Sequence, residues 1–245
     1  MNEIIRPKTG DSARLEILEQ HHLPEVLSLQ ASVRAALPLE QKMFVLPQPE
    51  SYFENFLARR GGAIIGLRMR GELAAQIVLM GPLTLEQAID KNAITRSEVA
   101  FHHAAPSESV AVAKSMAVHP DFQGNGLAQH LLQAALAQPL ARLADHVFAQ
   151  ISAENIRSWE LFLRNGFSIV AAALDPGDGQ PRFILQKPAL GFALHGVASI
   201  QDVDPAKDFS SIMRMTQREA LIGQLEIDTS LAFYARTEAA ASWYG

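Results

Sequence analysis

The residues whose types and spacing best suit chemistry form a short glycine-rich stretch in the middle of the chain. It runs from Gln123 to Ala128 with the sequence QGNGLA, between a β-rich run at Ser109 to Val118 and an apolar pattern typical of a helix. The first amides of a helix lack internal partners, and the helix dipole places about half a positive charge there. Such a turn can hold a phosphate group on its backbone without arginine or lysine.

Two other kinds of glycine-rich loop fit this stretch poorly. A P-loop requires Lys-Ser or Lys-Thr after its glycines, and neither follows here. The dinucleotide-binding fingerprint requires a third glycine where Gln129 stands. An isolated Gly-x-Gly is also compatible with a tight turn alone, so its meaning depends on the elements around it.

The elements predicted before the loop include both strands and helices. Apolar periodicity and turn residues predict a strand at Ala13 to Leu18, a helix opened by Pro24, a second helix with a capping box at Ser51 and Glu54, and a hairpin around Gly71-Glu72. After the hairpin, a short helix signal begins at Thr84 within 81–108, a segment that looks like an insertion or lid.

The elements predicted after the loop are also helices and strands. They are a helix containing Leu127 and Leu131, a strand at His146 to Ile151, a helix at Asn155 to Arg164 ended by Gly166, and strands at Phe167 to Ala173 and Phe183 to Gln186. The glycine loop therefore stands between a strand and a helix in an α/β (α+β) chain.

Two stretches resemble the cofactor motifs of the GNAT superfamily of N-acyltransferases. Gln123-x-x-Gly126-x-Ala128, preceded by Val118-x-Pro120, is similar to its pyrophosphate-binding motif. The spacing of its second cofactor motif is met by Asn155, Ser158, Phe162, Arg164 and Gly166-Phe167. The resemblance covers the element order from Ala13 to Lys187. It implies a GNAT-like fold with a mixed, mostly antiparallel central sheet flanked by helices, followed by a C-terminal extension.

The resemblance also implies acetyl-CoA, or another acyl-CoA, as acyl donor, with no metal. An amide of the strand before the loop would bind the thioester oxygen, which is oxyanion-type stabilisation. The residues implied in cofactor binding are Met116, Ala117, Val118, Gln123, Gly124, Asn125, Gly126, Leu127, Ala128, Asn155, Ser158 and Phe162.

The catalytic side chains depart from the superfamily's pattern. Its second motif commonly carries a tyrosine as general acid, whereas this chain has Phe162, which cannot donate a proton. Ser158, Tyr234 and Tyr244 are the alternative hydroxyl groups. The frequent base carboxylate of the central strand is also missing. The candidates for the acid and base are therefore Glu108, at the start of that strand, His103, beside His102 in a polar loop, and Ser158.

The composition limits the partners and the reaction. A formal net charge of −5 argues against a nucleic-acid partner and leaves a small-molecule or peptide amine as the acceptor. The absence of cysteine excludes a thiolate metal site and an acyl-cysteine intermediate, and no HExxH motif occurs. Since no stretch approaches the roughly 20 apolar residues of a membrane span, no membrane partner is expected and the cytoplasm is the expected location.

The expected organisation is an acyl-CoA-binding domain at 1–187, with the insertion at 81–108, and an extension at 188–245. The extension has a helical pattern from Pro205 to about Leu225. Two roles are left open for it, completion of an acceptor pocket or a dimer arm, and the second would make the protein a homodimer.

The expected function is an N-acyltransferase that moves an acetyl or short acyl group directly from acyl-CoA to an amine acceptor. One alternative is a non-catalytic, regulatory acyl-CoA-binding module, which Phe162 motivates. A dinucleotide-binding protein is the third hypothesis.

Overall fold

The computed structural model describes residues 12–95, 107–175 and 177–188, together with three short strands at Glu3–Ile5, Val197–Ser199 and Ala232–Tyr234. The chain divides into two units. One comprises Met1–Pro82 and Ala113–Arg142, and the other comprises Leu83–Val112 and Leu143–Gly245. The division falls within two strands, β4 (Glu72–Thr84) and β5 (Ser109–Val118).

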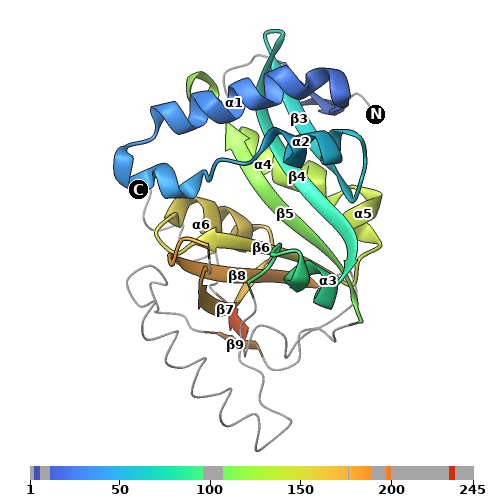
Figure 1. Ribbon diagram of the computed structural model, residues 1–245, viewed down its shortest axis with the longest axis vertical. Helices are drawn as coiled ribbons and strands as arrows, with labels where there is room; N and C mark the ends of the chain where they lie inside the picture. The colour runs from blue at the N-terminus through green and yellow to red at the C-terminus, as the bar shows by residue number, and fades with distance from the viewer. Residues whose placement is uncertain are drawn as a thin grey trace, which may run out of the picture. The chain divides into compact units, whose positions relative to one another are not determined.

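The first unit contains an antiparallel series of strands in the order β1-β2-β3-β4. Its members are β1 (Glu3–Ile5), β2 (Ala13–Ile17), β3 (Gly62–Met69) and most of β4 (Figure 1). The turn between β3 and β4 lies at Arg70 and Gly71, both with positive φ, where Gly71 suits the left-handed conformation. The hairpin predicted around Gly71-Glu72 is therefore confirmed.

Helices cover this sheet and enclose the core of the first unit. On one face lie α1 (Leu23–Ala36) and α2 (Glu50–Leu57), and Figure 1 shows α4 (Leu127–Leu136) behind the strands. Short helical turns are η1 (Gln20–His22), η2 (Leu39–Phe44), η3 (Pro120–Phe122) and α5 (Pro139–Arg142). The buried core beneath α1 and α2 includes Val26, Leu29, Phe53, Phe56, Ile64, Val78 and Ala117.

Local signals predicted the start of α1 but not that of α2. Pro24 lies in the first turn of α1, as expected from its missing amide hydrogen and fixed φ. The capping box predicted at Ser51 and Glu54 is wrong. A box with Ser51 as N-cap would start the helix at Tyr52, whereas α2 begins two residues earlier, at Glu50, with Pro49 as N-cap and no side-chain cap. Proline presets an extended backbone geometry at the residue before the helix, so Ser51 is already inside the first turn.

The second unit contains a sheet in the order β6-β8-β7-β10-β9. Strands β6 (His146–Ser152), β8 (Pro181–Pro188), β7 (Ser168–Leu174) and β10 (Ala232–Tyr234) pair antiparallel, and only β9 (Val197–Ser199) pairs parallel with its neighbour β10. Its helices are α3 (Leu85–Asp90) and α6 (Ile156–Arg164). The expected mixed, mostly antiparallel sheet flanked by helices is confirmed.

Two short strands of the sequence after Pro188 add to this sheet. Phe233 of β10 pairs with Ile169 of β7. The helix predicted from Pro205 to about Leu225, as well as His102 and His103, lie outside the described residues. No helix in the described parts of the chain is long and apolar enough to cross a bilayer.

An arginine links three elements of the first unit. Arg68 on β3 donates from Nε to Glu16 of β2 at 2.9 Å, and from Nη1 and Nη2 to the two carboxylate oxygens of Glu25 on α1 at 3.1 and 2.6 Å. Nη1 also donates to the Gly71 carbonyl of the hairpin turn at 2.8 Å. The bidentate contact is the geometry in which arginine binds carboxylates most strongly. Hydrogen bonds from Arg68 hold the pKa of Glu25 below its ordinary value of 4.5.

We expect Glu25 to contribute stability that depends on pH. A carboxyl with a lowered folded-state pKa contributes fully above the unfolded value of about 4.5 and loses that contribution as pH falls through the folded pKa. Glu25→Gln should reduce the free energy of unfolding by less than about 1 kcal/mol at pH 7, because Glu25 is partly exposed. Urea unfolding at a series of pH values from 7 down to about 3 measures the difference, which should shrink as pH falls through the folded pKa of Glu25.

Glu72→Gln removes an exposed carboxylate of the same hairpin and serves as control. An equal loss in the two variants at pH 7 would contradict a specific role of the Arg68–Glu25 contact.

Candidate active site

The glycine loop leaves β5 through η3 and enters α4, as predicted. Gly124 and Gly126 have φ of 81° and 74°, a left-handed conformation that glycine adopts without strain. A Cβ placed on either residue would meet no atom within 4 Å, so both face open space. The two glycines are therefore required by the path of the backbone and leave room for an approaching ligand.

The N-terminus of α4 has no side-chain cap. Its N-cap residue is Gly126, and the first turn contains no acidic residue. Gln123, Gly124 and Gly126 are exposed, whereas Asn125 and Leu127 are buried. The side-chain amide of Asn125 donates from Nδ2 to the Phe122 carbonyl at 3.1 Å and so fixes the loop from inside. This arrangement presents backbone rather than side chains to a ligand.

The strand before the loop departs from regular geometry at Ser115. Its φ is 49°, whereas the other described non-glycine residues with positive φ, at positions 59, 70 and 92, lie in turns. Lys114, Ser115 and Met116 are half-buried in succession, after four buried residues at 110–113. A left-handed serine costs on the order of 1 to 3 kcal/mol and must be held by its surroundings.

A tyrosine from α2 contacts this irregular residue. The Tyr52 hydroxyl lies 3.1 Å from Ser115 Oγ, and either oxygen could donate the hydrogen bond. The Tyr52 ring packs nearly edge-on against Phe56, with centroids 5.0 Å apart. Burial is the main reason that the pKa of Tyr52 is raised. Tyr52 and Ser115 were not expected from the sequence; two adjacent polar residues in a strand, Lys114 and Ser115, are the signal that could have indicated an irregularity.

The residues of the second motif lie in the other unit, on or beside α6. Asn155 is the N-cap of α6 and accepts from the Ser158 backbone amide through its side chain at 3.3 Å, so it has a structural role at the start of this helix. Ser158 is half-buried. Phe162 is only 3% exposed, and its ring packs against Phe167 at 5.0 Å between centroids. The contacts of these residues with a cofactor stay predictions.

Glu108 has a partner that the sequence did not suggest. Nε2 of His146, which is buried, lies 3.2 Å from a carboxylate oxygen of Glu108. The other ring nitrogen, Nδ1, lies 3.0 Å from the Gln186 side-chain nitrogen. Since an amide nitrogen can only donate, Nδ1 accepts and Nε2–H donates to Glu108. His146 thus anchors Glu108, while His103 lies outside the described residues.

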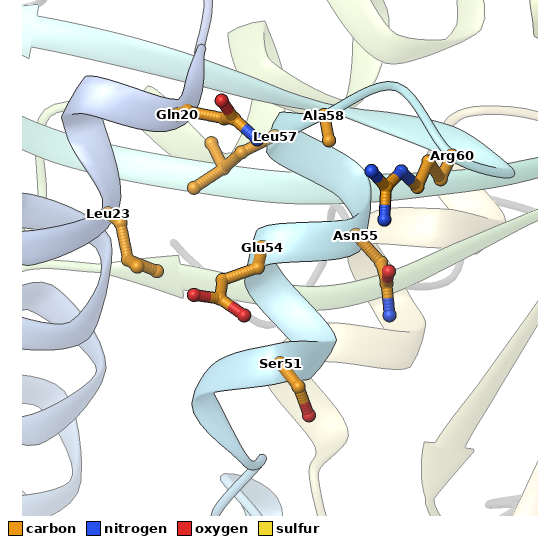
Figure 2. Close-up of a pocket in the computed structure, with 8 residues that line it drawn as sticks. All are labelled: Gln20, Leu23, Ser51, Glu54, Asn55, Leu57, Ala58 and Arg60. Atoms are coloured by element: carbon orange, nitrogen blue, oxygen red, sulfur yellow. The ribbon is translucent and has the colours of Figure 1, made fainter.

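Within the described residues, no group of three or more histidines and carboxylates could hold a metal ion. A pocket of about 400 Å³ lies between η1, α1 and α2, and none of the glycine-loop residues lines it. Its lining includes Gln20, Leu23, Glu54, Asn55 and Arg60, and Figure 2 shows the Glu54 carboxylate on the side of α2 toward Leu23.

Comparisons with known proteins bear on this arrangement. The sequence model of the acetyltransferase (GNAT) family matches residues 33–167, more than half of the 245-residue chain. The chain belongs to the GNAT acetyltransferase family. The matched range includes the glycine loop and α6, so this GNAT acetyltransferase contains both segments on which the resemblance was based. No curated protein matches the sequence.

Solved structures share the GNAT fold with this chain at low sequence identity. One is the ribosomal-protein-S18-alanine N-acetyltransferase from Escherichia coli, with 16% identity, 75% of this chain and 97% of that chain covered, and a TM-score of 0.53. The GNAT domain of S. lividans PAT has 17% identity, coverage of 76% and 96%, and a TM-score of 0.53. Arabidopsis thaliana NAA60, in complex with acetyl-CoA, has 15% identity, coverage of 73% and 99%, and a TM-score of 0.53.

We expect Asn155→Ala to destabilise the protein because it removes the cap of α6. Loss of an N-cap side chain typically costs about 1 kcal/mol. Asn155→Asp, which retains an acceptor oxygen, should keep most of that stability. Urea unfolding measures both changes, and equal destabilisation by the two substitutions would contradict the capping interaction.

Proposed function

We propose that this GNAT acetyltransferase transfers an acetyl group from acetyl-CoA directly to a primary amine of a small molecule or peptide. The observation that carries the proposal is the start of α4, where no side chain caps the helix behind two open, left-handed glycines. The acetyl-CoA complex of Arabidopsis thaliana NAA60, which has the same fold, supports the choice of donor.

The loop residues fit a pyrophosphate group. Helix N-termini bind anions through amides that lack internal partners and through the helix dipole. Gly124 and Gly126 are exposed and leave space where a side chain would otherwise stand, while Asn125 and Leu127 anchor the loop. We assign the pyrophosphate to the backbone of 123–128, and the pantetheine arm to Met116, Ala117 and Val118.

The chemistry that acetyl-CoA supplies when bound is an acetyl group activated as a thioester. An amide among Met116 to Val118 would donate to the carbonyl oxygen, where negative charge develops as the amine nitrogen attacks. Alignment of the two reactants can supply most of the remaining rate enhancement. Since the chain has no cysteine, transfer proceeds without an acyl-cysteine intermediate.

The attacking amine must lose a proton and the departing coenzyme A thiolate must gain one, and no single side chain is assigned to either transfer. Phe162 is buried in aromatic contact with Phe167 and has no group that titrates. Ser158 is the remaining hydroxyl of the second motif, and Glu108 is a carboxylate anchored by His146. Both stay candidates, and a missing acid or base typically lowers a rate by about 10² to 10⁴ without abolishing it.

The acceptor and the sequence after Pro188 are part of the same proposal. We propose 1–187 as the acyl-CoA-binding domain and the extension at 188–245 as a contributor to the acceptor pocket or to a dimer. The pairing of β10 with β7 supports an integral rather than a dispensable extension. Deletion of 188–245 without any change in oligomeric state or acceptor range would contradict both roles.

The central test combines binding and transfer. Isothermal titration should show binding of acetyl-CoA and not of NAD, and a thiol-release assay over a broad panel of amines should identify an acceptor. Binding without release against any amine would favour a non-catalytic module. Binding of NAD without acetyl-CoA would favour a dinucleotide site.

The loop itself is tested by a pair of substitutions that differ in charge. Gly126→Asp places a carboxylate beside the proposed pyrophosphate, and repulsion of a few kcal/mol would weaken acetyl-CoA binding by about 10²-fold or more. Gly126→Asn is the matched control, because asparagine and aspartate tolerate left-handed φ similarly. Titration calorimetry measures both affinities.

Both substitutions strain the left-handed backbone at position 126 to a similar degree, but a Cβ there meets no neighbour, so the fold should survive in both variants. Equal affinities of the two folded variants for acetyl-CoA would exclude a phosphate group from this loop.

A further inference from the structure

The contact between Tyr52 and Ser115 joins α2 to the irregular part of β5. The two residues are 63 positions apart in sequence, and their oxygens are 3.1 Å apart. Ser115 directly precedes Met116, the first of the residues assigned to the pantetheine and the thioester. The direction of the Met116 amide therefore depends on the conformation of Ser115, since the two share a peptide bond.

The conformation of Ser115 requires support from outside its own strand. A left-handed serine is strained, and a regular strand would return it to negative φ, which would rotate the following peptide. The side chain of Ser115 is held by Tyr52, whose ring is itself fixed by edge-on packing against Phe53 and Phe56 at 5.1 and 5.0 Å. The support thus comes from a rigid aromatic cluster of α2.

We propose that the Tyr52–Ser115 hydrogen bond is a positioning device for acyl transfer: it holds the backbone of Met116 to Val118 in the orientation that binds the thioester carbonyl. The inference rests on the proposed function, in which these amides stabilise the developing oxyanion. Preorganised donors are effective because they need no rearrangement during the reaction.

The chemistry of Tyr52 fits this role. Burial raises its pKa, so the phenol keeps its proton at neutral pH and remains able to donate to Ser115 Oγ. Its hydroxyl contacts Ser115, and Tyr52 is therefore assigned as a positioning residue.

The test uses Tyr52→Phe, Ser115→Ala and the double variant. Each single change removes one oxygen and retains the packing of the residue. Ser28→Ala, which removes an exposed hydroxyl of α1, is the matched control. Two ligands that differ only in the carbonyl oxygen, acetyl-CoA and S-ethyl-CoA, are titrated into each protein without acceptor.

The preference for acetyl-CoA over S-ethyl-CoA should fall by about 10-fold in Tyr52→Phe and in Ser115→Ala, because loss of one hydrogen bond misaligns the carbonyl donor. Affinity for S-ethyl-CoA should not change. The double variant should lose no more than either single variant, since both remove the same interaction. With the amine found by screening, kcat should fall by about 10², whereas KM for acetyl-CoA should rise by no more than about 10-fold, the loss of affinity expected above.

Hydrogen exchange of the ligand-free proteins separates this inference from the proposed function. The amides of Met116 to Val118 should exchange faster in Tyr52→Phe than in Ser28→Ala. Failure of the unaltered protein to bind acetyl-CoA would overturn the proposed function, and with it the catalytic role of the contact, even if exchange behaves as expected. An unchanged ligand preference in both single variants, or additive losses in the double variant, would overturn the positioning role while leaving the proposed function intact.

Discussion

The N-cap of helix α4 is a residue that has no side chain, and the candidate site depends on this constraint. Because Gly126 cannot cap the helix, the first amides of α4 are available to an external anion. The two left-handed glycines then fix where the backbone turns, and Asn125 and Leu127 anchor the loop from within. Strand β5 precedes this loop, and its irregular residue Ser115 lies directly before Met116 to Val118, the segment assigned to the acyl group.

The parts of the fold that sequence predicts are those specified by neighbouring residues. The strand, glycine loop and helix, the hairpin at Gly71 and the cap at Asn155 each depend on a few consecutive positions. The start of α2 was misplaced by two residues, because a capping-box spacing at Ser51 competes with the stronger constraint of Pro49. Local chemistry therefore predicted most elements and some of their ends.

The parts of the site that sequence did not predict join distant positions. Tyr52 meets Ser115 across 63 residues, and His146 meets Glu108 across 38. Neither pair has a spacing that indicates contact, and a left-handed serine within a strand has no reliable local signature. Phe162 in the second motif is a similar case. The sequence shows that a tyrosine is missing there, but only the folded structure shows that the Phe162 ring packs against Phe167.

Lys187, the last residue of the proposed acyl-CoA-binding domain, is held in place near the end of β8 in the second unit. It pairs with Val147 within the β6–β8 ladder, and its ammonium donates to the Asn165 carbonyl at the end of α6 at 2.9 Å. The ammonium also lies close to Gly166, where an added Cβ would be only 2.7 Å from the nitrogen. Partial burial of the side chain lowers the pKa of Lys187. A shortened chain that ends before Lys187 would therefore lose this hydrogen bond at the C-terminal end of α6 together with a rung of the β6–β8 ladder.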